Sequence, residues 1–202
     1  MLVVDNFFPS ELIDSVVSKS NNYEWKFCRT DKNEDTYWTV HVYGNNYTST
    51  DKEPLESEFR LQEVKDCWEF IKNKFIQTIG DGNLESCYLN GLTHGIEAHA
   101  HVDNKSSDNF VTVICYVCEA WNSHWCGETC FYNMGHSENP AHEIYYSHDI
   151  IKSVLPRYNR VVMFDGNVVH SVRPLSKTFK GLRKTLMFKL KNVNIKELQY
   201  AT

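Results

Sequence analysis

The sequence predicts a mainly-β protein with helices toward its N-terminus, and two features of the chain support this fold class. Before Gly80, apolar residues recur with the roughly 3.6-residue period of a helix, over 10–20 and again over 55–79. After Gly80 the pattern changes to short β-branched and aromatic runs separated by turn residues. A helical front followed by an all-β body is typical of antiparallel sheets that are covered on one side by helices.

The helical front has one expected start and one expected end. Ser10 is a suitable N-cap for the first helix, and Gly80 is expected to end the second. The second helix should cover the outer face of the larger sheet. In chain order we expect a helix at 10–20, strands at 25–29 and 36–42, a loop rich in Gly, Asn, Thr and Ser at 44–52, and a helix at 55–79.

The β body is expected to consist of short strands joined by turns. The turn pair Asp165-Gly166 predicts a hairpin, with Val168 and His170 on its return strand. These two side chains share one face, so His170 points into the core if that face is the interior. The strands are expected at 84–91, 96–101, 110–118, 129–133, 150–155, 160–164, 167–172 and 183–190.

Three side chains carry the donor atoms of a non-haem Fe(II) site. Such a site uses two imidazoles and one carboxylate on one face of the metal and leaves the opposite positions open. His101 and Asp103 lie two apart in an extended segment, so both can reach one metal. His170, on the return strand, is the expected third ligand.

A chelating 2-oxo acid would need a cation for its distal carboxylate, and arginine offers two parallel N–H donors. Arg173 and Arg183 are the candidates downstream of His170. Arg173 falls on the strand face opposite His170 and precedes Pro174, which favours a solvent-facing position. Arg183 opens a strongly apolar strand, and we therefore select it as the anchor.

Several short motifs follow one another in order over roughly 84–191. They are Tyr88-Leu89-Asn90-Gly91, His101-Val102-Asp103-Asn104, 112–118, Gly127-Glu128-Thr129, 156–164, His170-Ser171-Val172-Arg173-Pro174 and 183–190. Together they resemble the 2-oxoglutarate and Fe(II)-dependent oxygenases, most closely the compact prolyl-hydroxylase branch. The resemblance implies a double-stranded β-helix, a jelly roll of two packed sheets with helices against one of them. It also implies a single oxygenase domain over 1–202, with a front of about 1–83 and a catalytic core of about 84–191.

The same resemblance implies roles for individual residues. His101, Asp103 and His170 would bind Fe(II), and Arg183 would pair with the distal carboxylate of 2-oxoglutarate. The site residues that would complete the cosubstrate pocket are Tyr116, Tyr88 and Thr185. The implied reaction uses O2 to hydroxylate a C–H bond, expected to belong to a prolyl residue of a peptide or protein, and releases succinate and CO2. Ascorbate is expected to support turnover.

Two departures from the family pattern accompany the resemblance. The gap between His170 and Arg183 is longer than is usual in the hypoxia-sensing prolyl hydroxylases, with the insertion at 176–181. Cys126-Gly127-Glu128 stands where a Gly-Gly pair is commoner. Neither departure touches an expected iron ligand, but the first weakens the assignment of Arg183.

Alternatives remain open at this stage. His99 and His101 partly resemble the His-x-His of cupins, although the glutamate expected after it is missing. A non-prolyl oxygenase acting on another side chain or a small metabolite, and an inactive binding module, are further alternatives. A structural zinc site would use cysteines, namely Cys115, Cys118, Cys126 and Cys130. Trp121 and Trp125 could line a substrate groove or pack in the core, and the loop at 44–52 could close over a substrate.

Composition fits one soluble domain of 202 residues, with a net charge of −5 from 21 basic and 26 acidic residues. This balance argues against nucleic acid as a partner. The charged residue after three apolar ones, at Asp5, argues against a signal peptide, and no run is long enough to span a membrane. Seven cysteines, an odd number, predict reduced thiols and a cytoplasmic location. A protein or peptide substrate is the expected partner, and the oligomeric state is left open between monomer and dimer.

Overall fold

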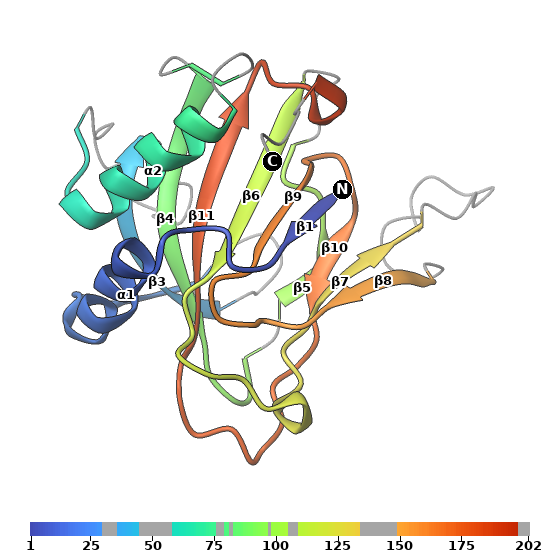
Figure 1. Cartoon of the computed structure of the whole chain (residues 1–202). Helices are drawn as coiled ribbons and strands as arrows, with labels where there is room; N and C mark the ends of the chain where they lie inside the picture. Colours follow the sequence, from blue (N-terminus) through green and yellow to red (C-terminus); the bar gives the residue numbers. More distant parts are fainter. Residues whose placement is uncertain are drawn as a thin grey trace.

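The chain folds into two antiparallel sheets that face each other, with helices on the outer side of the larger one (Figure 1). The structure, a computed structural model, describes residues 1–29, 36–44, 58–75, 79–80, 83–96, 98–104, 109–133 and 149–197. This architecture is a double-stranded β-helix, so the predicted fold class is confirmed.

The larger sheet has seven strands in the described part of the chain, and the smaller has four. The larger runs, in spatial order, β1 (Leu2–Val4), β9 (Val161–Asp165), β6 (Phe110–Tyr116), β11 (Arg183–Lys191), β4 (Leu84–Leu92), β3 (Thr36–Gly44) and β2 (Lys26–Arg29). The smaller runs β5 (Ala98–His101), β10 (His170–Val172), β7 (Thr129–Tyr132) and β8 (Ile150–Val154). Aromatic residues such as Phe131 and Phe164, together with aliphatic residues such as Ile114 and Val162, fill the space between the sheets.

Helices α1 (Ser10–Lys19) and α2 (Gln62–Lys74) cover the outer face of the larger sheet (Figure 1). The Trp68 ring of α2 stacks on Phe188 of β11, with ring centroids 5.9 Å apart. The expectation that the second helix covers the larger sheet is therefore confirmed. In the described part of the chain, no helix combines the length and apolar character needed to cross a membrane.

Strand β11 lies in the middle of the larger sheet, and nearly all of it is buried on both faces. Its outward side chains Leu186, Phe188 and Leu190 belong to the core beneath the helices. Outward Lys184 is also buried, and its Nζ donates to Ser20 Oγ at 2.7 Å and Asn21 Oδ1 at 2.8 Å just beyond α1. Strand alternation then directs the intervening residues of β11, from Arg183 to Lys189, toward the space between the sheets.

The first helix has nearly the expected extent, but its N-cap is not the expected residue. Pro9, rather than Ser10, is the N-cap residue, and Ser10 is the first helical residue. The ring of Pro9 restricts its φ, and with φ −53° and ψ 142° the residue has an extended backbone. The cap therefore rests on backbone conformation, and no side-chain cap bond is present.

The second helix is shorter than predicted. Leu61 has an extended backbone, Arg60 N–H donates to Val42 O at 3.1 Å, and the Phe59 ring stacks on Tyr43. The segment before Gln62 is thus held against β3 instead of continuing the helical pattern. The helix ends at Lys74, where Phe75 leaves the helical conformation, so the expected end at Gly80 is wrong; positions 55–57 and 76–78 of the predicted range lie outside the described residues. Of the predicted loop at 44–52, Gly44 ends β3 and 45–52 lie outside the described residues.

The predicted hairpin around Asp165-Gly166 is also wrong. Strand β9 pairs with β1 and β6 of the larger sheet, whereas β10 pairs with β5 and β7 of the smaller one. Gly166 N–H donates to Phe110 O at 2.8 Å, and Gly166 O accepts from Asp103 N–H and Asn104 N–H. A side chain at Gly166 would meet the Phe110 ring at 2.5 Å, which explains the glycine. The turn therefore crosses from one sheet to the other.

Truncation of the core under α2 should be costly. We expect Phe188→Ala to lower the free energy of unfolding by about 3–5 kcal/mol, because the fully buried ring would leave a cavity against Trp68. The matched control is Phe27→Ala, since Phe27 is 54% exposed and should change stability far less. Urea unfolding of both variants measures the difference. Equal losses in the two variants would contradict this description of the core.

Candidate metal centre

The structure brings His101, Asp103 and His170 together between the sheets. His101 ends β5 and lies directly opposite His170 of β10, and the two ring centroids are 4.5 Å apart. Asp103 Oδ1 lies 3.7 Å from His101 Nε2, and Asp103 Oδ2 lies 3.6 Å from His170 Nε2. In the described part of the chain this is the one group of His, Cys, Asp or Glu side chains whose possible ligand atoms all lie within 4.8 Å of one another.

The backbone holds these side chains in place. The β5–β10 ladder fixes the two histidines, and the turn at Gly166 holds Asp103 through its N–H, which donates to Gly166 O at 2.9 Å. The sequence pattern that predicted a hairpin thus has a different function. The Asp165-Gly166 turn anchors the carboxylate-bearing residue next to the strand that carries His170.

Both imidazoles have their Nε2 atoms available for a metal. His101 Nδ1 lies 2.8 Å from His99 O, and His170 Nδ1 lies 3.0 Å from Val168 O. A carbonyl oxygen only accepts hydrogen bonds, so each Nδ1 carries a proton and donates it. In the neutral ring the Nε2 lone pair is then free, and it points toward Asp103 in both residues.

Charge and burial favour cation binding at this cluster. Burial lowers the pKa of His170 to about 4, so this ring is neutral at neutral pH. Burial alone would raise the pKa of Asp103, but Lys189 and the two histidines hold it well below its ordinary value. Two imidazoles and one ionised carboxylate match the donor set of a non-haem Fe(II) site. The residues present therefore fit this metal.

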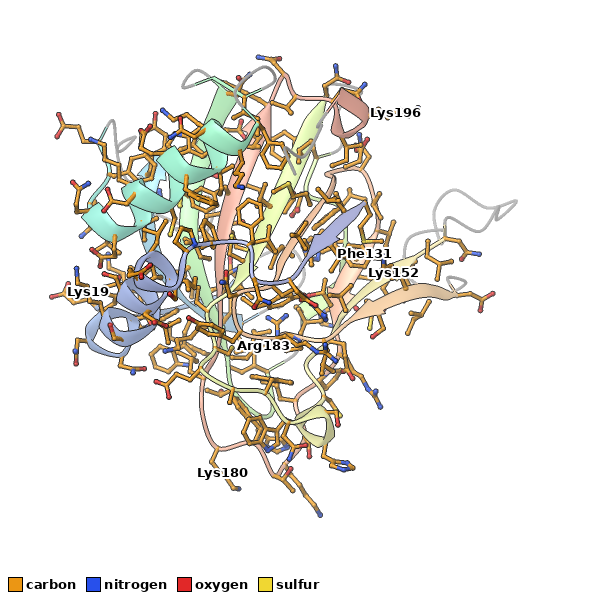
Figure 2. All side chains as sticks on the ribbon, in the orientation of Figure 1. Lys19, Phe131, Lys152, Lys180, Arg183 and Lys196 are labelled. Carbon is orange, nitrogen blue, oxygen red and sulfur yellow. The ribbon has the colours of Figure 1, made fainter. Side chains whose placement is uncertain are left out.

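Arg183 lies at the start of β11, on the inner face and only 2% exposed. Its Nε donates to Gly127 O at 2.7 Å and its Nη2 to Thr129 Oγ1 at 3.1 Å, while its Cζ lies 5.4 Å from the centre of the Tyr116 ring. Figure 2 shows Arg183 within the protein, whereas Lys180 extends outward from a neighbouring loop. No carboxylate of the described residues forms an ion pair with Arg183. A buried cation of this kind is suited to an anionic ligand.

The other predicted pocket residues lie on the same inner face. Tyr116 is fully buried, and its hydroxyl is 2.7 Å from Thr129 Oγ1, which also contacts Arg183. Thr185 of β11 lies directly opposite both Tyr116 of β6 and Asn90 of β4. Tyr88 packs against the cluster between the sheets. The predicted set therefore lies together on the inner face of the larger sheet, near Arg183.

Three polar residues of this interior were not selected from the sequence. They are Asn90, Thr112 and Lys189, all on inner faces of the larger sheet. Asn90 Oδ1 is buried, without a hydrogen-bond partner in the described part of the protein. Lys189 and Thr112 both contact Asp103 Oδ2. Continuing the alternation from Arg183 along β11 would have placed Lys189 on the inner face.

The alternative residues lie elsewhere. Arg173 has a side chain that is 60% exposed and pairs with Glu128 at 3.6 Å, as its strand face predicted. His99 is exposed on β5 and is not part of the cluster. Cys115 packs under the helices, whereas Cys130 lies on β7 of the smaller sheet, so the structure does not bring the zinc candidates together. All seven cysteines are free thiols, and the cytoplasmic location stays a prediction.

Trp121 and Trp125 are half-buried and pack against each other and against Phe179. Their ring centroids are 5.5 Å apart, and Phe179 lies 4.9 Å from Trp121 and 5.3 Å from Trp125. Phe179 comes from the insertion at 176–181, which thus contributes a buried side chain next to the Arg183 end of the fold. The longer connection between His170 and Arg183 is therefore ordered by aromatic packing.

The Cys126 backbone is strained, with φ 60° and ψ −137°. A residue with a β-carbon pays about 1–3 kcal/mol in such a conformation, whereas glycine adopts it freely. We therefore expect Cys126→Gly to raise the midpoint of thermal unfolding by roughly 2–4 °C, after the larger backbone entropy of glycine is subtracted. Cys126→Ala, which keeps the β-carbon, is the control. A gain in the alanine variant as large as in the glycine variant would attribute the effect to the thiol instead.

The fold and the site together define a class, the jelly-roll proteins that place a two-histidine, one-carboxylate cluster between two sheets. The sequence profile of the 2OG-Fe(II) oxygenase superfamily matches residues 86–188, about half of the chain. The protein therefore belongs to the 2OG-Fe(II) oxygenase superfamily, whose members use Fe(II) and 2-oxoglutarate. None of the curated proteins compared with the chain matches it by sequence.

Solved structures confirm the fold and include prolyl hydroxylases. One is a prolyl hydroxylase from Trichoplax adhaerens in complex with a peptide fragment of hypoxia inducible factor, with TM-score 0.62, 17% identity, and coverage of 97% of this chain and 84% of that one. A prolyl-4-hydroxylase from Pseudomonas putida has TM-score 0.57 and 15% identity, covering 94% and 91%. HygX from Streptomyces hygroscopicus, with nickel and 2-oxoglutarate bound, has TM-score 0.59 and 14% identity, covering 94% and 82%.

Proposed function

We propose that the protein is a 2-oxoglutarate-dependent Fe(II) dioxygenase that hydroxylates a prolyl residue of a peptide or protein and releases succinate and CO2. The observation that carries the proposal is the convergence of His101, Asp103 and His170 at one end of an interior region that holds buried Arg183 at the other. In this proposal the chain forms a single catalytic domain over 1–202, and ascorbate supports its turnover.

The proposed metal ligands are the Nε2 atoms of His101 and His170 and a carboxylate oxygen of Asp103. Fe(II) held there with 2-oxoglutarate would supply the oxidative decarboxylation and the oxidant for an unactivated C–H bond. Three protein ligands suit this chemistry, because a fourth would occupy a position that the cosubstrate or oxygen needs.

Arg183 is the proposed partner of the distal carboxylate of 2-oxoglutarate. It is held by Gly127 O and Thr129 Oγ1, so its planar guanidinium is already oriented before a ligand arrives. Thr185 and Tyr116 would offer hydroxyl groups next to that carboxylate, and Tyr88 would line the pocket.

Apolar side chains lie on the inner face of the larger sheet between Arg183 and Lys189. Met187 of β11 lies between Arg183 and Lys189 on the inner face, directly opposite Ile114 of β6. Both belong to the buried cluster between the sheets. They would pack against the methylene groups of the cosubstrate and exclude water from the path between its two carboxylates.

A prolyl substrate is supported by the likeness to prolyl hydroxylases over nearly the whole chain, one of them in complex with a peptide. The test is succinate formation from 2-oxoglutarate by purified protein with Fe(II) and ascorbate, using proline-containing peptides and the same peptides with each proline replaced by alanine. We expect turnover that depends on proline, together with a peptide mass increase of one oxygen atom. Turnover that is equally stimulated by the alanine peptides would overturn the prolyl assignment and favour another side chain or a small metabolite.

A further inference from the structure

We propose that Lys189, together with Thr112, is a positioning residue that holds one oxygen of Asp103, so that the carboxylate presents only its other oxygen to the metal. The inference rests on the proposed function, since it concerns the same metal centre. Its ground is a pair of buried side chains, Lys189 and Thr112, which contact Asp103 and to which the metal-ligand assignment gives no role.

Lys189 is an unusual residue for its place. It lies on the inner face of β11, 5% exposed, directly opposite Ser86 of β4 and Thr112 of β6. A lysine on a central strand is expected to be exposed, and burying its ammonium group is costly unless the charge is paired. The pairing partner is Asp103, whose Oδ2 forms an ion pair with Lys189 Nζ.

Thr112 completes a closed set of contacts around the same oxygen. Its hydroxyl donates to Asp103 Oδ2 at 2.6 Å, and Lys189 Nζ lies 3.3 Å from Thr112 Oγ1, to which it donates. The single proton of the hydroxyl thus goes to the carboxylate, while its lone pair accepts from the ammonium group. Asp103 Oδ2 contacts both of these donors and also lies 3.6 Å from His170 Nε2, whereas Asp103 Oδ1 lies 3.7 Å from His101 Nε2 and contacts neither Lys189 nor Thr112.

This arrangement has a consequence for the coordination number. A carboxylate can bind a metal through one oxygen or two. If Asp103 bound through both, the protein would fill four positions and leave too few for a chelating cosubstrate and oxygen. Because Lys189 and Thr112 contact Oδ2, Asp103 would bind a metal through Oδ1 alone, which would leave the other positions open.

The test compares Lys189→Met with Lys184→Met. Both lysines are buried and hydrogen-bonded on β11, but Lys184 lies on the outer face and contacts Ser20 and Asn21 beyond α1. Co(II) serves as the probe in place of Fe(II), because its visible absorption reports coordination number and because Co(II), unlike Fe(II), is stable in air. Each protein is titrated with Co(II) alone and then with 2-oxoglutarate.

We expect Lys189→Met to bind Co(II) with an altered absorption spectrum and to bind 2-oxoglutarate about 10–100-fold more weakly than the wild-type protein. Lys184→Met should match the wild-type protein in both titrations. Lys189→Arg, which keeps the charge, should restore part of the 2-oxoglutarate affinity. Thr112→Val, which keeps the shape but removes the donor, should change the spectrum in the same direction as Lys189→Met.

The inference is overturned if Lys189→Met and Thr112→Val both give the wild-type Co(II) spectrum and the wild-type 2-oxoglutarate affinity. Should Lys189→Met not fold, as judged by circular dichroism, the comparison of Thr112→Val with the wild-type protein decides alone. Failure of the proposed function looks different, because the wild-type protein itself would then bind neither Co(II) nor 2-oxoglutarate.

Discussion

Asp103→Ala is expected to abolish 2-oxoglutarate turnover and to weaken Fe(II) binding by more than about 100-fold. Loss of a residue that only supports a metal ligand costs roughly 10–100-fold, and Asp103 is itself a proposed ligand. The reason is that Asp103 is the one carboxylate of the His101, Asp103 and His170 cluster in the described chain. Without it, two imidazoles remain and no carboxylate. The metal would then lose both a ligand atom and the negative charge that offsets its own.

The same substitution leaves Lys189 buried without its carboxylate partner, which should destabilise the metal-free protein. Asp103→Asn separates the two effects, since it keeps the shape of the side chain. Asp5→Asn is the control, because Asp5 pairs with Arg160 at the surface and far along the chain from the cluster. Calorimetric titration with Fe(II) under nitrogen, with a thermal unfolding scan of each variant, measures both effects. Full turnover by Asp103→Ala would remove the iron assignment.

Arg183→Ala is expected to raise the KM for 2-oxoglutarate by at least about 30-fold, with little turnover left at ordinary concentrations. Truncating one partner of a buried, hydrogen-bonded charge pair costs about 2–5 kcal/mol, and each 1.4 kcal/mol is tenfold in affinity. Arg183 satisfies both conditions, since it is 2% exposed and its guanidinium is oriented by Gly127 and Thr129. The KM of Arg183→Lys for 2-oxoglutarate should lie between those of the wild-type protein and Arg183→Ala, because an ammonium group keeps the charge but cannot form two parallel hydrogen bonds to a carboxylate.

Arg173→Ala is the matched control for this experiment. Arg173 is the other arginine that follows His170 closely, but its side chain is 60% exposed and pairs with Glu128. Initial rates at varied 2-oxoglutarate, with the other substrates saturating, separate KM from kcat in both variants. A large rise in KM for Arg173→Ala with none for Arg183→Ala would transfer the anchor to the other residue.

Local spacing predicted much of the site. His101 and Asp103 lie two apart, and strand alternation was enough to place both near one metal. His170 does lie beside His101 and Asp103, but the reason given for placing it there was wrong, since β9 and β10 do not form a hairpin. Which sheet a strand joins depends on partners distant in the sequence, such as β5 for His170, and a turn signal carries no information about them.

The residues that sequence reasoning missed share a physical cause. Lys189 is a charged residue in a strand, where the default expectation is exposure. Its burial becomes understandable only with Asp103, 86 positions earlier in the chain, beside it. The extent of the second helix was misjudged for a related reason, because the pairing of Arg60 with Val42 overrides a local helical pattern.

The position of β11 in the sheet also affects the order in which the protein can fold. It is the last strand in chain order among the described residues, yet it lies between β6 and β4 in the sheet. In the finished sheet β6 and β4 lie about 9–10 Å apart, two strand spacings, and β11 fills the space between them. Both strands are synthesised before β11, so neither can pair with it until the end of the chain is made. Such late, long-range pairing is slow. Arg183 and Lys189 both lie on this strand, so under the proposed function turnover would require the completed larger sheet.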